Sequence, residues 1–311
     1  MNNRRTIITV GMFDGVHWGH RFLIDQLDNL AKELNMIPAV ISFDKHPLKF
    51  IKPEKAPELI MTPSVKQAFL EIGSTKRKIY IIKSEPEIFE LTAREFILLL
   101  KKIVNVKAIL LGYNNGFGSD LVNTPEKLRE ALKGTGIEVY EAPKYDGEEV
   151  SSSAIREAIK KGDMKKAKRM LGTTFFMEGT VVKGQQIGRQ LGFPTANIEI
   201  NEDMIVPGNG VYAAICYGCP TMLNIGTAPT IRHNGGITIE AHIITEHQLS
   251  NKKVNIPNLY GKKLEIVIVE KIREECKFDD TEKLKEQLEK DRKDTIEKIH
   301  NFCNSSIEKC R

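Results

Sequence analysis

The stretch TIITVGMFDGVHWGH, residues 6–20, decides the fold predicted for the first half of the chain. Its β-branched opening predicts a strand over residues 6–10, and apolar residues sharing one face predict a helix over about residues 20–34. The loop between them contains Gly11, Gly15 and Gly19. A glycine-rich turn into a helix presents free backbone N–H groups and the positive end of the helix dipole, which together attract phosphate. The stretch therefore predicts a nucleotide site.

Two histidines three residues apart, His17 and His20, stand at the entrance of the predicted helix. Both can donate hydrogen bonds to one phosphate where negative charge develops during displacement at phosphorus. An isolated pair of this kind more often caps a helix or binds a metal. Its place in the first strand-to-helix loop favours phosphate chemistry, and the lack of a G-x-x-x-x-G-K-[ST] sequence argues against a P-loop.

The composition limits the classes of function. The chain has 311 residues and a net charge of +5, too small and dispersed to predict a nucleic-acid or membrane surface. No apolar stretch approaches the roughly 20 residues that a membrane span needs. Five cysteines are too few for a disulfide scaffold, so we expect a cytoplasmic protein. Cys216 and Cys219 form one C-x-x-C, which without a second pair nearby suits a strand end and a turn better than zinc.

The first half alternates strands with helices. Further strands are predicted over residues 39–43, 79–82, 108–111 and 137–140, and further helices over about 63–72, 92–104 and 124–133. Such alternation predicts a parallel sheet covered on both faces, with ligands beyond the carboxyl ends of its strands. Residues 151–171 predict two helices divided near Gly162. We place the domain boundary after Gly172, which gives domains 1–172 and 173–311.

The second half has short strands separated by turns rich in Gly, Pro and Asn. Strands are predicted over residues 179–182, 211–216, 238–244 and 264–269. Strands without intervening helices predict a small β-barrel. Asp279 and Glu282 form a capping-box-like start to a final helix. Four of its apolar residues are expected to pack on the barrel: Leu284, Leu288, Ile296 and Ile299.

The densest motif joins GTVVKG at residues 179–184 to GRQLGFPTAN at residues 188–197. A glycine-rich loop with basic residues is a flexible cover for phosphates. Thr195 and Asn197 lie two apart in an extended segment, so their side chains point the same way and can hold Mg²⁺ together with phosphate oxygens. The same two side chains could instead satisfy the backbone groups of a hairpin.

The segment Phe13–His20 resembles the signature of the H-x-G-H nucleotidyltransferases, and within them the bacterial FAD synthetases. FDKHP at 43–47 and SSSAIR at 151–156 resemble further motifs of that family in the same order, although serines before a helix are usually caps. The resemblance implies a Rossmann-like fold and transfer of AMP from ATP to FMN. It implies catalytic roles for His17, His20 and Arg156. The implied nucleotide contacts are Gly11, Phe13, Asp14, Gly15, Ser151, Ser152 and Ser153.

Residues 112–118 take the place of the family's G-x-D-F-x-F-G loop near the adenine and the flavin. Asn, Asn and Gly at 114–116 stand where Asp, Phe and a basic residue are common, and Met12 replaces a polar residue. The catalytic residues are unaffected, so we expect adenylyl transfer to survive, while the flavin side of the site could be weakened or altered. The flavin contacts implied by the resemblance are Asn114, Phe117 and, in the second half, Arg273.

Residues 179–197 closely resemble the G-x-V-x-x-G-x-x-x-G-R-x-L-G-F-P-T-A-N segment of riboflavin kinases. Later pieces follow in family order, at residues 210–212, 224–230, 239–242, 259–261 and 273–278, so the resemblance covers essentially the whole chain. It implies a six-stranded β-barrel in which Glu240 is the general base and Thr195 and Asn197 hold Mg²⁺. The residues expected along the ADP phosphates are Lys183, Gly184, Gly188 and Arg189.

We therefore expect a bifunctional enzyme of the bacterial riboflavin kinase/FAD synthetase family. The C-terminal domain would phosphorylate riboflavin to FMN with MgATP, and the N-terminal domain would adenylylate FMN to FAD with release of pyrophosphate. Two alternatives stay open. The N-terminal domain could be inactive or altered in specificity, as Met12 and residues 114–116 suggest, or the chain could be a flavin-binding regulator without turnover. The sequence does not determine an oligomeric state.

Overall fold

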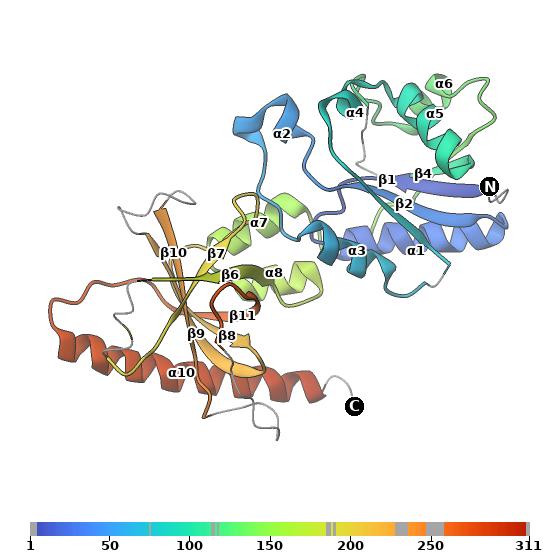
Figure 1. The fold of residues 1–311 in the computed structure, drawn as a ribbon. Helices are drawn as coiled ribbons and strands as arrows, with labels where there is room; N and C mark the ends of the chain where they lie inside the picture. The colour runs from blue at the N-terminus through green and yellow to red at the C-terminus, as the bar shows by residue number, and fades with distance from the viewer. Residues whose placement is uncertain are drawn as a thin grey trace. The chain divides into compact units, whose positions relative to one another are not determined.

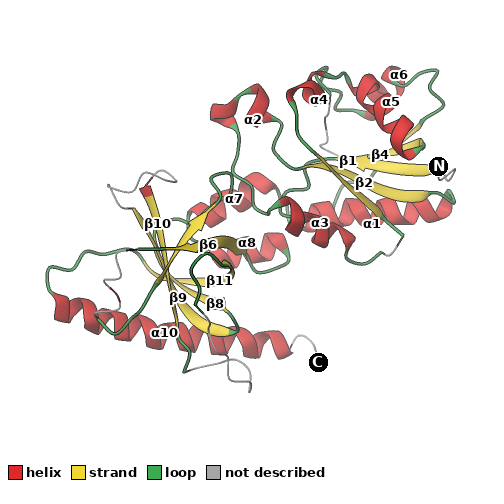
Figure 2. Ribbon diagram, viewed as in Figure 1, coloured by secondary structure: helices red, strands yellow, loops and turns green. Residues whose placement is uncertain are grey.

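The chain forms two compact units, Met1–Ser152 and Ser153–Arg311, each with its own sheet (Figure 1). A computed structural model describes residues 5–74, 76–112, 116, 118–184, 188, 191–227, 236–246 and 258–308, with side chains up to residue 305. Helices and strands alternate in the first unit, whereas strands dominate the second (Figure 2).

A five-stranded parallel sheet in the order β3-β2-β1-β4-β5 forms the centre of the first unit. Its strands are β1 (Thr6–Val10), β2 (Ile37–Phe43), β3 (Lys78–Ile82), β4 (Val106–Leu111) and β5 (Glu138–Glu141). Every residue of β1 is buried, as a parallel strand covered on both faces requires. The five predicted strands and their parallel arrangement are confirmed.

Helices cover both faces of this sheet, as predicted. Figure 1 shows α1 (Trp18–Glu33) and α3 (Pro63–Glu71) on one face, and α5 (Ala93–Val104) and α6 (Pro125–Ala131) on the other. Apolar side chains of α5 and α6 pack with those of the strands in one buried cluster. Three short elements were not predicted, because one turn of helix is too short to show a periodicity: α2 (Leu48–Ile51), η1 (Pro53–Lys55) and α4 (Pro86–Glu90).

The order of the strands locates the ligand-binding edge of the sheet. The chain runs from β1 outward to β2 and β3, then crosses back to β4 and β5, so the connections leave β1 and β4 in opposite directions. Ligands bind in the crevice that opens at such a switch point, outside the carboxyl ends of the strands. The loop of residues 11–17 and the loop that begins at Gly112 both start there.

A closed barrel in the order β10-β7-β6-β11-β8-β9, with all neighbours antiparallel, forms the second unit. The predicted six-stranded barrel is thus confirmed. Two strands, β7 and β9, had not been predicted individually, because prolines, glycines and asparagines in and around them obscure the alternation. The strands are β6 (Phe176–Val182), β7 (Ala196–Ile200), β8 (Gly210–Cys216), β9 (Cys219–Thr227), β10 (Ile237–Ile243) and β11 (Lys263–Arg273).

In the described ranges of this unit the helices are α7 (Ser152–Lys160), α8 (Met164–Leu171) and α10 (Thr281–Glu308). Gly162, at φ +74°, separates α7 from α8 as expected, and α8 packs on β11. The boundary between the two compact units falls after Ser152, so α7 and α8 belong with the barrel. The predicted functional boundary between residues 172 and 173 stays a prediction.

The terminal helix α10 packs on β8, β9 and β11. Leu288 and Ile296 contact a buried cluster around Phe193, and Ile299 is fully buried, as expected. The prediction of Asp279 as the cap is wrong by one residue. Instead, Oδ1 of Asp280 accepts a hydrogen bond from the backbone N–H of Glu282 at 2.9 Å. None of the helices in the described ranges is both long and apolar enough to cross a membrane.

The C-x-x-C closes a β-hairpin. Cys216 and Cys219 are paired residues of β8 and β9, and the two residues between them have φ of +52° and +70°, which is the type I′ turn typical of two-residue hairpins. Both thiols are free and buried, and burial raises the pKa of Cys216 to about 11. In the part of the chain that the structure describes, His, Cys, Asp and Glu form no group of three that could hold a metal.

Candidate active sites

The loop of residues 11–17 connects β1 to α1 in a strained conformation. Phe13 and Val16 have φ of +49° and +39°, a region that favours glycine and is unusual for a β-branched residue. Each of these side chains is only 1% exposed, so packing holds the backbone in place. Strain of this kind concentrates at ligand-binding and catalytic sites, where it presets geometry.

The buried residues Asp14 and Lys66 anchor this loop. The buried carboxylate of Asp14 accepts hydrogen bonds from the backbone N–H groups of Ile60 at 3.0 Å and Met61 at 3.2 Å. Lys66 on α3 donates to the carbonyl of Met12 at 3.0 Å. The structure therefore gives Asp14 the role of a loop anchor, and its direct contact with a nucleotide stays a prediction.

The two histidines form a stacked pair at the N-terminus of α1. Their ring centroids are 3.6 Å apart with an interplanar angle of 16°, and Nδ1 of His17 accepts from the backbone N–H of His20 at 3.4 Å. The ring of Phe13 meets the edge of His20 at a centroid distance of 5.2 Å. Phe13, predicted as a nucleotide contact, thus supports His20 from within the core.

The environment of His20 keeps its imidazole neutral. Burial lowers the pKa of His20 well below the usual 6.5, and the nearby charges of His17 and Lys66 lower it further. Its buried Nδ1 has no hydrogen-bond partner in the described parts of the chain. A buried ring nitrogen without a partner is costly, so a bound ligand or water would satisfy it.

A pocket of 790 Å³ opens beside the histidines, lined by His17, Gly19, His20, Gly112, Lys144, Tyr145, Ser151 and Ser152 among others. The hydroxyl of Ser152 donates to the carbonyl of Asp14 at 2.9 Å, so the predicted serine segment does reach the loop. Ser151 is exposed at the pocket. The exposed Ser153 and the half-buried Arg156 lie on α7 in the second unit, and their nucleotide contacts stay predictions.

A second pocket, of 770 Å³, is more apolar and is lined by the start of the same loop, whereas the first pocket is lined by its end. Its lining includes Gly11, Met12, Phe43, His46, Pro47, Phe50, Phe89, Gly116 and Gly118. Gly112 lines the first pocket while Gly116 and Gly118 line this one, so the loop after β4 serves both. Of the predicted flavin contacts here, Asn114 and Phe117 lie outside the described residues.

In the barrel, the structure brings together the predicted residues Thr195, Asn197 and Glu240. Asn197 of β7 is paired with Glu240 of β10, and directly opposite residues of antiparallel strands present their side chains on one face. The hydroxyl of Thr195 donates to Oε2 of Glu240 at 3.3 Å. Both strands belong to a closed barrel, which holds the three oxygen-bearing side chains rigidly.

The glycine-rich loop closes onto this cluster. A Cβ at Gly184 would lie 1.9 Å from Nδ2 of Asn197, and one at Gly188 would lie 2.4 Å from the carbonyl oxygen of Phe193, so neither position has room for a larger residue. Lys183, next to Gly184, is exposed. Arg189 lies outside the described residues. Glycines that permit this close an approach are what a phosphate-covering loop requires.

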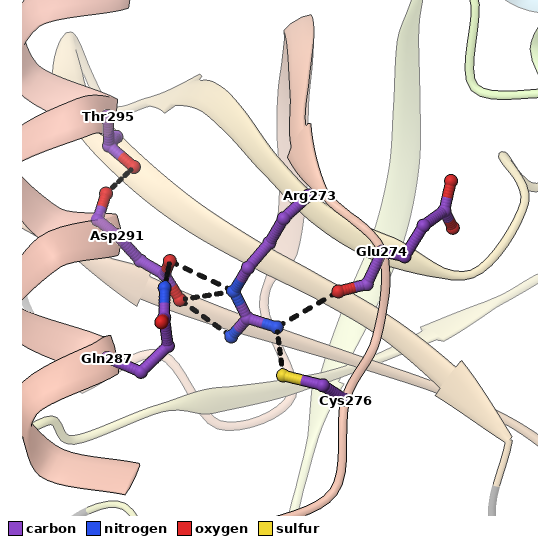
Figure 3. A network of polar contacts seen from close by, with 6 residues as sticks. All are labelled: Arg273, Glu274, Cys276, Gln287, Asp291 and Thr295. Carbon is purple, nitrogen blue, oxygen red and sulfur yellow. Dashed lines mark hydrogen bonds and ion pairs between the residues drawn. The ribbon is translucent and has the colours of Figure 1, made fainter. Parts of the chain in front are cut away.

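Arg273, a predicted flavin contact, has a different environment (Figure 3). Its guanidinium binds the carboxylate of the fully buried Asp291 on α10 with distances of 2.7 to 3.1 Å. It also donates to the carbonyl of Glu274 at 3.0 Å and to Sγ of Cys276 at 3.1 Å. Burial alone would lower the pKa of Arg273, but Asp291 outweighs it and raises the pKa. The structure thus shows Arg273 holding α10 against β11, and its contact with a flavin stays a prediction.

Two residues of these sites were not predicted. Lys66 lies four residues before the buried Leu70 on α3, and residues four apart share one face of a helix. This spacing was the one feature of the sequence that could have placed Lys66 in the core. His242 lies on β10 two residues after Glu240, and its Nδ1 is 2.9 Å from the carbonyl oxygen of Pro194. His242 therefore braces the turn that carries Thr195.

Comparisons with known proteins match both halves of the chain. The family model for FAD synthetase matches residues 1–154, and the model for riboflavin kinase matches residues 171–299. Proteins named bifunctional riboflavin kinase/FMN adenylyltransferase are similar over nearly their whole length. The one from Haemophilus influenzae is 33% identical, covering 96% of this chain and 94% of its own. The one from Buchnera aphidicola is 32% identical, covering 97% and 95%.

A crystal structure titled as a macrolide-efflux protein from Streptococcus pneumoniae has a similar fold. Its TM-score is 0.79 at 26% identity, and the match covers 95% of both chains. The two-unit architecture is therefore shared over nearly the full length.

The Arg273–Asp291 pair predicts a large effect on stability. Asp291→Ala would leave a guanidinium that is only 21% exposed without its partner, and losing one partner of a buried pair costs about 3–5 kcal/mol. We expect that reduction in the free energy of unfolding of the barrel, measured by urea denaturation of the full chain. As the matched control, Glu157→Ala breaks the exposed Lys161–Glu157 pair and should cost below about 0.5 kcal/mol. Equal effects of the two substitutions would contradict the assignment.

The close approach at Gly184 predicts a kinase defect. Gly184→Ala would force the side chain of Asn197 to move, and displacing a reacting geometry by about 1 Å costs roughly 100-fold in rate. Conversion of riboflavin to FMN should fall accordingly, while the conversion of FMN to FAD should stay unchanged. Glu202→Ala serves as the control, because Glu202 is an exposed residue of the same unit. A fully active Gly184→Ala protein would refute the importance of the contact.

Proposed function

Because the chain belongs to the bifunctional riboflavin kinase/FMN adenylyltransferase family, we propose that its barrel phosphorylates riboflavin to FMN and its first unit adenylylates FMN to FAD. ATP is the second substrate of both reactions. The observation that carries the proposal is the pair of pockets on either side of residues 11–20, one beside the histidines and one apolar. An enzyme that joins a nucleotide to a flavin needs two such neighbouring pockets. We place both reactions in the cytoplasm, which the few free cysteines suit.

In the kinase reaction, the primary hydroxyl of riboflavin attacks the γ-phosphorus of ATP. A new O–P bond forms as the bond to the β–γ bridging oxygen breaks, and ADP leaves. Glu240 accepts the hydroxyl proton, a role that suits a carboxylate fixed on a rigid strand. The hydrogen bond from Thr195 orients this carboxylate.

The residues around Glu240 fit Mg²⁺. Hydroxyl, amide and carboxylate oxygens are the ligands that this ion prefers, and with ATP it takes only one or two from the protein. Thr195 and Asn197 would hold it together with phosphate oxygens. When bound, it neutralises part of the phosphate charge. Gly184 and Gly188 let the loop backbone approach the phosphates, and Lys183 adds a positive charge above them.

In the adenylyl transfer, a phosphate oxygen of FMN attacks the α-phosphorus of ATP. The bond to the β-phosphate oxygen breaks and pyrophosphate leaves. FMN is already ionised at this oxygen, so no general base is needed. His17, His20 and the free N–H groups of α1 would stabilise the charge that develops at phosphorus.

The shape of the apolar pocket favours FMN over another acceptor. Three phenylalanines lie near one another there: the ring centroid of Phe89 is 5.4 Å from that of Phe43 and 5.5 Å from that of Phe50. Aromatic walls and a volume of 770 Å³ suit a flat isoalloxazine ring. Met12 presents an adaptable apolar side chain to the same space, which is compatible with a flavin.

Two substitutions should separate the reactions. Glu240→Gln keeps the shape but removes the base, so FMN formation should fall roughly 100- to 10,000-fold while FMN is still converted to FAD. His17→Ala should do the reverse and cost adenylyl transfer roughly 100- to 1,000-fold. Each purified protein is given MgATP with riboflavin or with FMN, and the flavins are identified by chromatography.

The same assay with the unmodified protein tests the alternatives. FMN without FAD would select a kinase with an inactive or altered first unit, and binding without either product would select a flavin-binding regulator. If either substitution abolished both reactions in a folded protein, the assignment of separate sites would be wrong.

A further inference from the structure

Lys66 is a charged residue buried in the first unit, where neither the family motifs nor the proposed chemistry gives it a role. It is 2% exposed, and its ammonium donates to the carbonyl of Phe43 at 2.5 Å and to that of Met12 at 3.0 Å. These two carbonyls lie where the chain leaves β2 and β1. Lys66 therefore links the ends of two neighbouring strands, at the edge of the sheet where this fold binds its ligands.

Satisfying the carbonyl of Met12 does not by itself explain this lysine. The hydroxyl of Ser42 already donates to that carbonyl at 2.9 Å. Burying an ammonium costs several kcal/mol more than burying a neutral donor. Burial lowers the pKa of Lys66 and the carboxylates of Asp14 and Asp44 raise it, with a net value of about 8. The fold thus retains a cation whose burial is costly.

The two carbonyls that Lys66 binds belong to walls of the ligand pockets. Met12 and Phe43 both line the apolar pocket, and Met12 lies in the loop that continues to His17 and His20 in the nucleotide pocket. The described linings of the two pockets do not include Lys66 itself. Any effect of Lys66 on the reaction therefore passes through these residues or through its charge, which already reaches His20.

We propose that Lys66 is a positioning residue for adenylyl transfer: by binding the ends of β1 and β2 it sets the separation and orientation of the flavin phosphate relative to the α-phosphorus of ATP. The inference rests on the proposed function of the first unit. It follows that Lys66 acts on the turnover number and leaves the binding of each substrate alone. Positioning acts in this way because reacting atoms must be aligned in the bound complex.

The test compares Lys66→Met, which keeps length without charge, with Lys66→Arg, which keeps the charge. Lys66→Met should lower kcat for FMN-to-FAD conversion roughly 10- to 100-fold, with KM for ATP and FMN unchanged within about threefold. Lys66→Arg should recover part of this loss. FMN formation by the barrel is the internal control for both, and Lys32→Met, an exposed lysine of α1, is the control for loss of a charge.

The pH dependence of the reaction gives a second readout. The ammonium form predominates below pH 8, and above it the neutral amine loses the charge that strengthens both hydrogen bonds. In the unmodified enzyme, kcat for FAD formation should therefore fall as the pH rises through about 8. In Lys66→Arg this fall should be absent, because a guanidinium stays protonated.

The outcomes separate the inference from its premise. If the unmodified protein forms no FAD, the proposed function itself fails. If it forms FAD and Lys66→Met is as fast, Lys66 has no positioning role. Folding of the first unit is followed through Trp18, the one tryptophan of the chain, next to the nucleotide pocket. Should Lys66→Met fail to fold, the pH profiles of the unmodified enzyme and Lys66→Arg decide: a fall present in the first and absent in the second supports the role, and identical profiles overturn it.

Discussion

The backbone groups exposed where β1 ends must find hydrogen-bond partners away from the sheet, and the first unit is organised around this need. A carbonyl at Met12 is bound by a buried lysine and a serine hydroxyl, the carboxylate of Asp14 binds two amides of a distant segment, and His17 caps the helix that follows. Together, these hydrogen bonds fix a loop that packing alone would leave free to take several conformations. Residues of this loop line both pockets, so these hydrogen bonds also fix part of each pocket wall.

The two units fix the positions of the residues of their proposed phosphate sites by different physical means. The first uses the dipole of a helix and buried charges, which act where water is excluded. The second uses register, because a closed barrel fixes which side chains of β7 and β10 share a face. Arg273 and Asp291 extend this second device by fastening α10 to the end of β11. Electrostatics thus positions the adenylyl site, and strand pairing positions the kinase site.

Much of this arrangement is visible in the sequence. The alternation of strands and helices predicted the parallel sheet. The spacing of Thr195 and Asn197 predicted that they act together, because alternation along a strand is a local property. Lys66 and Asp291 could not be found in this way. A lysine and an aspartate within a highly charged helix look solvent-exposed in sequence, and only tertiary packing buries them. Strand β9 was hidden because Pro220, Asn224 and Gly226 interrupt its pattern.

The left-handed backbone of Val16 affects which substitutions this position can tolerate. A glycine there would relieve about 1–2 kcal/mol of backbone strain. It would also remove a buried side chain worth roughly 1.5–3 kcal/mol. These effects nearly cancel, so selection for thermal stability is close to indifferent between the two residues. The unfolded state adds a smaller difference, since valine restricts the loop before folding more than glycine does and so favours the native state by up to about 1 kcal/mol. The buried side chain and the stiffer unfolded chain thus offset the backbone strain, which explains how valine is tolerated in a conformation that suits glycine.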